Sequence, residues 1–229
     1  MRLKPCLKKC LTIPYGVLSH ISKSAVVIFL LICQPAFAER PTVLALGDSL
    51  TQGYGLAHED GFVPQLMQWL ADHDTPADII NAGVSGDTTA GGLARVEWSL
   101  TEDVDAMIVA LGSNDMLRGM APEDSYSNIE SILKIGRQRG LRLMIIGVRA
   151  PGNFGLTYKT NFDAIFPKLA KTYDAEYVEH FFESLIDPTE PNQPLLQYFQ
   201  NDRMHPNRQG VSEVVKTIGP VVQKLVSEY

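Results

Sequence analysis

The residues best suited to chemistry in this chain are one serine and one aspartate–histidine pair. Ser49 follows the apolar run 43–46 and the break Gly47-Asp48, which predicts a hydroxyl on a turn at the end of a buried strand. A serine alcohol is a weak nucleophile at neutral pH and needs a base that a third group orients. Asp202 stands three residues before His205, close enough to hold the imidazole in the tautomer that accepts a proton. These residues predict acyl transfer through Ser49.

Two further residues could donate hydrogen bonds to the oxyanion that such an attack creates. Gly86 follows the second apolar run, where a glycine N–H can approach a ligand closely, and Asn114 follows the third and carries a side-chain N–H. Each residue also has an ordinary structural interpretation, as a helix cap, a turn former or a member of a solvated loop. Their shared position after predicted strands favours catalysis, because the carboxyl ends of parallel strands form one edge.

The elements that must position these residues alternate between strand and helix. Short apolar runs predict strands near residues 43–46, 77–81, 105–111, 141–148 and 175–178. Helical spacing predicts helices near 61–71, 88–99, 122–140, 162–173 and 207–225, with a kink at Pro167 and a bend at Gly219-Pro220. The segment 187–201 is rich in Pro, Asn and Gln and predicts a loop. The alternation predicts an α/β fold with a five-stranded, mostly parallel sheet and helices on both faces.

The first 38 residues predict a signal peptide ahead of a single domain, residues 39–229. Five basic residues precede the apolar run Ala25–Cys33, and Ala36-Phe37-Ala38 matches a signal-peptidase site. The run is shorter than the roughly 20 apolar residues that span a bilayer. We therefore expect cleavage near Ala38, a periplasmic or secreted protein, and no stable membrane anchor. An uncut signal anchor is the alternative, and a translation start near Val17 stays open because the leader is long.

Composition excludes several classes of partner and cofactor. The leader holds five of the 20 basic residues and none of the 26 acidic ones, so its removal leaves a net charge of −11. That acidity argues against nucleic acid as a tightly held partner. All three cysteines lie in the leader, and no second histidine lies near His205 in sequence, so we expect no disulfide and no metal site.

Four blocks of the chain, in order and spacing, resemble those of the SGNH or GDSL hydrolases. They are Gly47-Asp48-Ser49-Leu50, Gly86, Gly112-Ser113-Asn114-Asp115 and Asp202-Arg203-Met204-His205. The resemblance covers nearly all of the mature chain. Within the family, residues 84–88, 117–119 and 167–171 are similar to the bacterial periplasmic branch of multifunctional acyl-CoA thioesterase I, lysophospholipase and arylesterase.

The resemblance implies a flavodoxin-like three-layer sandwich and hydrolysis of acyl esters and thioesters without a cofactor. It also implies that Ser49 is the nucleophile, His205 the base and Asp202 the residue that orients it. The implied oxyanion hole consists of the N–H groups of Ser49 and Gly86 and the side chain of Asn114. Ser113 departs from the branch, which commonly carries a glycine there, so the shape of the neighbouring pocket is left open.

Apolar residues in loops after the strands predict where an acyl group binds: Met116, Leu117, Met120, Pro151 and Phe154. We expect a monomer that acts on a small acyl ester, a thioester or a lysophospholipid. Two alternatives stay open at this point. One is a carbohydrate O-acetylesterase on the same fold, and the other is a non-catalytic binding protein.

Overall fold

The computed structural model describes residues 40–187 and 189–227, and Arg40–Tyr229 form one compact unit. The expected signal peptide, residues 1–38, lies outside the described residues, and its cleavage stays a prediction. Within the described part, no helix has the length and apolar character that a membrane span requires.

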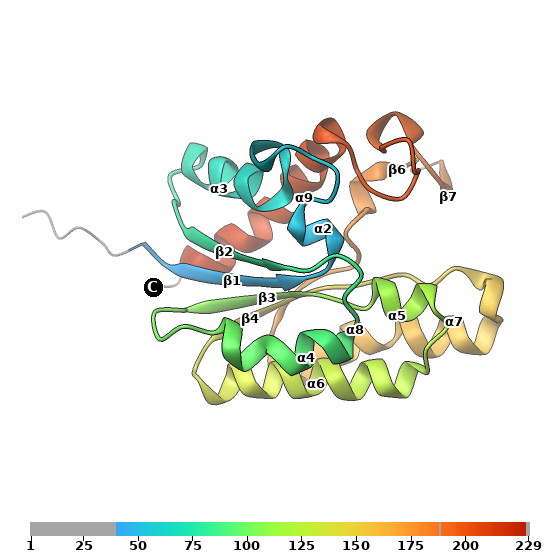
Figure 1. The fold of residues 1–229 in the computed structure, drawn as a ribbon, viewed down its shortest axis with the longest axis horizontal. Helices are drawn as coiled ribbons and strands as arrows, with labels where there is room; N and C mark the ends of the chain where they lie inside the picture. Colours follow the sequence, from blue (N-terminus) through green and yellow to red (C-terminus); the bar gives the residue numbers. More distant parts are fainter. Residues whose placement is uncertain (1–39, 188, 228–229) are drawn as a thin grey trace, which may run out of the picture. The chain divides into compact units, whose positions relative to one another are not determined.

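The centre of the fold is a five-stranded parallel sheet in the order β2-β1-β3-β4-β5 (Figure 1). Its strands are β1 (Thr42–Gly47), β2 (Asp78–Gly83), β3 (Ala106–Ala110), β4 (Arg142–Ile146) and β5 (Glu176–Val178). This is the order of a flavodoxin-like doubly wound sheet, so the predicted fold class is confirmed. Ser49, Gly86 and Asn114 follow the carboxyl ends of β1, β2 and β3, whereas Asp202 and His205 precede α9.

The inner strands separate two hydrophobic cores, one on each face of the sheet. In β1, Val43 and Ala45 belong to one core, whereas Leu44 and Leu46 belong to the other. A strand buried on both faces needs an apolar residue at every position. This requirement explains why β1, β3 and β4 appear in the sequence as unbroken apolar runs.

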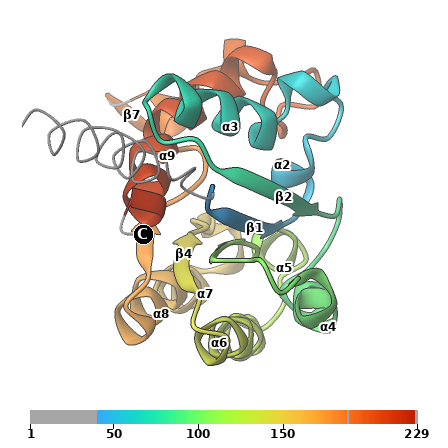
Figure 2. The same ribbon diagram turned by 90° about the vertical axis from the view of Figure 1, so that its left-hand side faces the viewer.

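Helices cover both faces of the sheet, as Figure 2 shows from the end of the molecule. One face carries α3 (Phe62–Asp72) and α9 (Arg208–Ser227), and the other carries α4 (Thr89–Ser99), α6 (Pro122–Gln138), α7 (Leu156–Asp163) and α8 (Ile165–Tyr173). Side chains cap two of these helices: Thr88 Oγ1 accepts from Gly91 N–H at the start of α4, and Asn207 Oδ1 accepts from Gly210 N–H at the start of α9.

Short elements at the carboxyl edge complete the fold. Two helices, α2 (Ser49–Gln52) and α5 (Ser113–Leu117), begin beside β1 and β3 and were not predicted. The 3₁₀ turns are η1 (His58–Asp60), η2 (Gly152–Phe154), η3 (Glu183–Leu185) and η4 (Leu196–Tyr198). The prediction of a plain loop at 187–201 is wrong, because β6 (Ile186–Asp187) and β7 (Glu190–Pro194) pair as an antiparallel hairpin. Prolines are tolerated there because a two-stranded sheet consists of edges alone.

The predicted interruption at Pro167 is present. The helical segment breaks at Ala164, between α7 and α8, and Pro167 lies in the first turn of α8. Pro167 has no N–H to donate to the carbonyl of Asp163, four residues earlier, and its ring clashes with that carbonyl, so the helix restarts there. The last helix, α9, continues through Pro220, and Gly219 there makes room for Trp69, whose ring would lie 2.6 Å from an added Cβ.

Candidate active site

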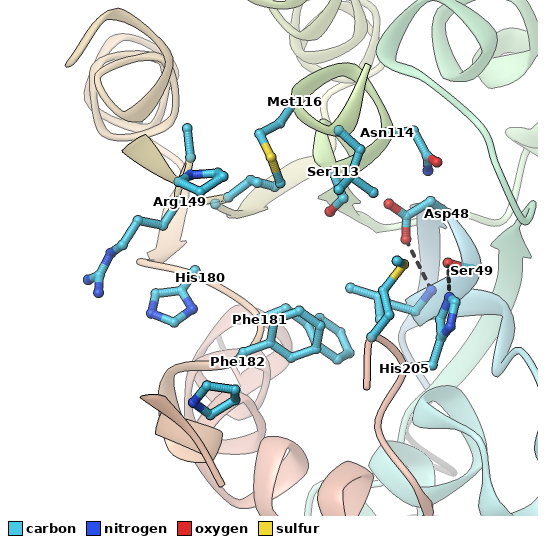
Figure 3. A pocket seen from close by; sticks show the side chains of 18 of the residues that line it. Asp48, Ser49, Ser113, Asn114, Met116, Arg149, His180, Phe181, Phe182 and His205 are labelled. Atoms are coloured by element: carbon cyan, nitrogen blue, oxygen red, sulfur yellow. Dashed lines mark hydrogen bonds between the residues drawn. The ribbon is translucent and has the colours of Figure 1, made fainter. Parts of the chain in front are cut away.

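Ser49 occupies the first position of α2, immediately after β1 leaves the sheet (Figure 3). Asp48 caps this short helix, and its carboxylate accepts a hydrogen bond from Leu50 N–H at 3.0 Å. The turn is tight, because a Cβ added at Gly47 would lie 2.0 Å from Thr51 Oγ1. Glycine at this position therefore lets the chain turn so that the Ser49 hydroxyl stands at the carboxyl edge of the sheet.

The structure brings Ser49, His205 and Asp202 into one line of contacts, although Ser49 and His205 are 156 positions apart. Ser49 Oγ lies 2.9 Å from His205 Nε2, and His205 Nδ1 lies 2.7 Å from Asp202 Oδ2. The ring of Tyr54 lies beside the imidazole, with the two centroids 4.6 Å apart. In this arrangement an imidazole whose Nδ1–H donates to a carboxylate can accept a proton from the serine at Nε2.

The carboxylate of Asp202 is held by the backbone of its own loop. The N–H groups of His205 and Met204 donate to Asp202 Oδ1 at 3.0 and 2.9 Å. Hydrogen bonds from the His205 N–H, the His205 ring and the Met204 N–H lower the pKa of Asp202 to about 2. Asp202 is therefore ionised at neutral pH, and its charge faces the imidazole.

Gly86 and Asn114 line the same pocket as Ser49. Gly86 is the third residue of a turn closed by Asp87 N–H donating to Val84 O, and its φ of +79° is the value that a type II turn requires. Asn114 belongs to α5, directly after β3. Within the described residues, neither the Gly86 N–H nor the Asn114 side chain makes a hydrogen bond that would occupy it. Both donors are free to meet an oxyanion.

Arg95 on α4 connects the loops that carry the site, and the sequence analysis missed it. Its guanidinium donates to Gly47 O at 2.9 Å, to Ala82 O at 2.8 Å and to Asp87 Oδ2 at 2.8 Å. These acceptors lie at the end of β1, the end of β2 and the loop that follows Gly86. The planar fork of an arginine suits such a three-way junction, which fixes the nucleophile turn relative to the Gly86 turn.

Asp115 anchors the other side of the proposed oxyanion site. Its buried carboxylate accepts hydrogen bonds from Thr89 N–H at 2.9 Å, Thr89 Oγ1 at 2.5 Å and Ser125 Oγ at 3.2 Å. These partners come from α4 and α6, so three helices meet at one carboxylate. A buried carboxylate that accepts several hydrogen bonds is a rigid anchor, and here it fixes the position of the adjacent Asn114.

A cavity of about 620 Å³ extends from Ser49 across the carboxyl edge of the sheet (Figure 3). Of the residues predicted to bind an acyl group, Met116, Leu117 and Pro151 line it, whereas Met120 and Phe154 are not among its lining residues. The loop of Phe154 does approach the site, but its ring packs over Gly119. Apolar lining that the prediction omitted includes Val148, Ala150, Phe181, Phe182 and Met204.

The wall that follows β5 is the part of the cavity that motif reasoning did not find. Phe181 and Phe182 line this wall, and Figure 3 shows His180 and Arg149 at the end remote from Ser49. His180 is 6% exposed, and burial, with the nearby Arg149 charge, lowers its pKa. The only sequence signal for this wall was its position after a strand end.

Asp48 is a buried acid beside Ser49, the predicted nucleophile. Its side chain is 1% exposed, and Oδ2 has no hydrogen-bond partner among the described residues. Burial raises the pKa of Asp48 from 3.8 to about 6, against the lowering effects of the Leu50 N–H and the nearby Ser113 hydroxyl. Ser113, which stands where the family branch commonly has a glycine, lies near this carboxyl group. Its hydroxyl lies outside hydrogen-bonding geometry with Asp48 Oδ2.

Comparison with known proteins agrees with this geometry. Residues 45–212 match the GDSL-like Lipase/Acylhydrolase family. The chain is 32% identical to Esterase TesA of Pseudomonas aeruginosa over 86% of this chain and 94% of that protein, and 32% identical to Thioesterase 1/protease 1/lysophospholipase L1 of Escherichia coli K12 over 87% and 92%. The crystal structure of AlinE4, an SGNH-hydrolase family esterase, superposes with a TM-score of 0.67 at 39% identity, covering 82% of this chain and 98% of that one. The chain therefore belongs to the GDSL-like lipase/acylhydrolase family, and it is a serine ester hydrolase.

Proposed function

We propose that this protein is exported and cleaves carboxylic esters and thioesters of apolar acyl groups through an acyl-enzyme on Ser49. The observation that carries the proposal is the pair of contacts at His205: Nε2 lies 2.9 Å from Ser49 Oγ, and Nδ1 lies 2.7 Å from Asp202 Oδ2. This geometry supplies a nucleophile, a base and a group that orients the base.

In the first half of the reaction, Ser49 Oγ attacks the acyl carbon while His205 Nε2 takes the hydroxyl proton. The carbonyl π electrons move onto oxygen, and the oxyanion receives hydrogen bonds from Gly86 N–H and the Asn114 side chain. Collapse of this intermediate breaks the bond to the leaving oxygen or sulfur, which receives the proton from His205. In the second half, water loses a proton to His205 and attacks the acyl-serine, and His205 returns that proton to Ser49.

The lining of the cavity supports an apolar acyl group of medium length. Met116, Val148 and Phe181 present side chains with no hydrogen-bonding partner for a sugar, whereas a small acetyl pocket beside a polar alcohol site would suit a carbohydrate O-acetylesterase. Each methylene group that enters such a cavity contributes about 0.8 kcal/mol at most. The names of the relatives, an esterase and a thioesterase/lysophospholipase, agree with this substrate class.

Two measurements test the proposed activity. A fluorophosphonate probe should label the wild-type protein and fail to label Ser49→Ala, with Ser85→Ala as the control, because Ser85 also lines the cavity but its hydroxyl donates to the amide oxygen of Gln52. The value of kcat/KM for p-nitrophenyl esters should then rise from acetyl to octanoyl. A preference for acetyl would remove the apolar acyl assignment and favour the carbohydrate esterase, and labelling that persists in Ser49→Ala would refute the nucleophile.

Export has a separate test. N-terminal sequencing of the protein from a periplasmic extract should begin at Glu39, because Ala36-Phe37-Ala38 ends the predicted leader. Recovery of a chain that retains the apolar run Ala25–Cys33 would contradict cleavage without affecting the proposed chemistry.

A further inference from the structure

Arg203 occupies an unusual position inside the loop between Asp202 and His205. Its φ is +57°, in the left-handed region that glycine adopts at little cost and an arginine adopts only at a cost. The side chain is exposed and lines the cavity together with its neighbours Met204 and His205. A residue that holds a disfavoured backbone conformation beside the proposed base is a candidate for a functional role.

Arg203 differs in its ion pairing from Arg149 and Lys159, two other cations that line the cavity. Arg149 is paired with Glu179, and Lys159 Nζ lies 2.7 Å from Asp163 Oδ2. Throughout the described ranges, no acidic side chain forms an ion pair with Arg203. The guanidinium is therefore a cation at the cavity that the protein itself leaves uncompensated.

The neighbouring Asp202 does not neutralise it. Its Oδ2 contacts the His205 ring at 2.7 Å, and its Oδ1 accepts from the Met204 and His205 N–H groups. Both oxygens are thus directed to the loop and the imidazole. The five N–H donors of Arg203 remain available to a group outside the protein.

The position of Arg203 also indicates which part of a substrate it meets. The proposed reaction requires His205 to give its proton to the leaving oxygen or sulfur, so the leaving group must lie on the His205 side of Ser49. The acyl oxygen is directed to Gly86 and Asn114 instead. Arg203 is two residues from His205 on the same loop and is therefore placed beside the leaving group.

We propose that Arg203 binds an anionic group carried by the leaving group of the substrate, an inference that rests on the proposed esterase function. A guanidinium pairs well with a phosphate or a carboxylate. The expected mature chain has a net charge of −11, so an anionic substrate meets an acidic protein overall, and an arginine without an acidic partner at the cavity offsets that repulsion locally. The phosphate could belong to a thioester carrier such as coenzyme A or to the head group of a lysophospholipid.

The test compares two octanoyl esters, 2-nitrophenyl octanoate and 3-octanoyloxy-4-nitrobenzoate. Their leaving groups differ by one carboxylate, which only the second ester carries. The variants are Arg203→Gly, which also relaxes the backbone, Arg203→Gln, and Arg203→Lys, which keeps the charge. Arg137→Gln, on the exposed end of α6, is the control for a simple change in net charge. Circular dichroism and a thermal melt of each variant show that it is folded.

We expect the ratio of kcat/KM for the charged ester to kcat/KM for the neutral ester to fall roughly two- to fivefold in Arg203→Gly and Arg203→Gln, the range of an exposed charge pair. The fall should come from KM, should be largely restored in Arg203→Lys, and should shrink as salt is raised. Arg137→Gln should keep the wild-type ratio. Octanoyl-CoA and an octanoyl lysophosphatidylglycerol, measured with the same variants, then identify which phosphate source depends on Arg203.

Equal losses for both esters, or a shift in the pH profile for the neutral ester, would overturn the proposal and assign Arg203 to the support of His205. A ratio that does not change in any Arg203 variant would also overturn it. Both outcomes require that wild type hydrolyses the neutral ester, so they are distinct from failure of the proposed esterase function, in which wild type cleaves neither compound.

Discussion

The substitution Asp48→Asn should make the protein more stable at neutral pH, although it alters the residue next to the proposed nucleophile. The carboxyl is 1% exposed, and its Oδ2 has no hydrogen-bond partner in the described part of the chain. Burial raises its pKa from 3.8 to about 6. Asparagine has nearly the same shape and keeps an oxygen that can accept the hydrogen bond from Leu50 N–H, so the cap of α2 should survive.

The size and pH dependence of the effect follow from the pKa shift. A rise of roughly two pKa units corresponds to about 3 kcal/mol at about 1.4 kcal/mol per unit. Because the folded-state pKa lies above the unfolded-state value, the native protein binds the proton more tightly, and the wild type loses stability as pH rises from about 4 to about 6. The loss is complete above that range. The amide introduced by Asp48→Asn cannot ionise, so the variant avoids this loss.

Urea unfolding of wild type and Asp48→Asn at about pH 4 and about pH 8 measures the effect. The advantage of the variant in the free energy of unfolding should grow by roughly 2 to 3 kcal/mol between the two pH values. The ionisation of Asp202, whose pKa is lowered, is common to both proteins and cancels in the difference. An advantage that does not depend on pH, or a variant less stable than wild type at about pH 8, would refute the assignment of the raised pKa to Asp48.

Three further predictions concern catalysis. Ser49→Ala and His205→Ala should each lose nearly all turnover in steady-state assays. The double variant should be hardly worse than either one, since the effects of substituting residues that act as a unit do not add. Additive losses would show that the two residues act separately. Asn114→Ala should lower kcat about 10²- to 10³-fold with little change in KM, because its hydrogen bond strengthens as the oxyanion forms, and an effect confined to KM would instead indicate ground-state binding. Met116→Ala should flatten the rise of kcat/KM with acyl chain length, whereas Met120→Ala, which does not line the cavity, should keep the rise; similar curves for the two variants would show that the acyl chain does not follow this wall.

The sequence was sufficient for the sheet because buried parallel strands need apolar residues at consecutive positions. The runs at Val43–Leu46 and 141–148 show this pattern directly, and their ends located the candidate residues. Short helices such as α2 and α5 were not predicted, since four or five residues are too few to show a helical period. The hairpin β6–β7 was missed because its Pro-rich strands are paired by tertiary structure and not by local preference.

The candidate site was predictable where residue type alone restricts chemistry. Ser49, Asp202 and His205 could be selected because few types of side chain can act as a nucleophile, as a base or as an acid that orients the base. The anchoring roles of Arg95 and Asp115 were not predicted, since an arginine or an aspartate within a helix usually faces solvent. Their roles depend on three-dimensional contacts with loops that are distant in sequence.

The packing of α9 against α3 joins two parts of the proposed site that are far apart in the sequence. Ser49 belongs to the first strand and turn, whereas His205 directly precedes the last helix, whose apolar face shares a core with α3. Contacts between such distant segments form late, because loop closure must precede them. A chain still lacking α9 should therefore have a formed nucleophile turn and no base. Recovery of ester hydrolysis during refolding should therefore report the docking of α9.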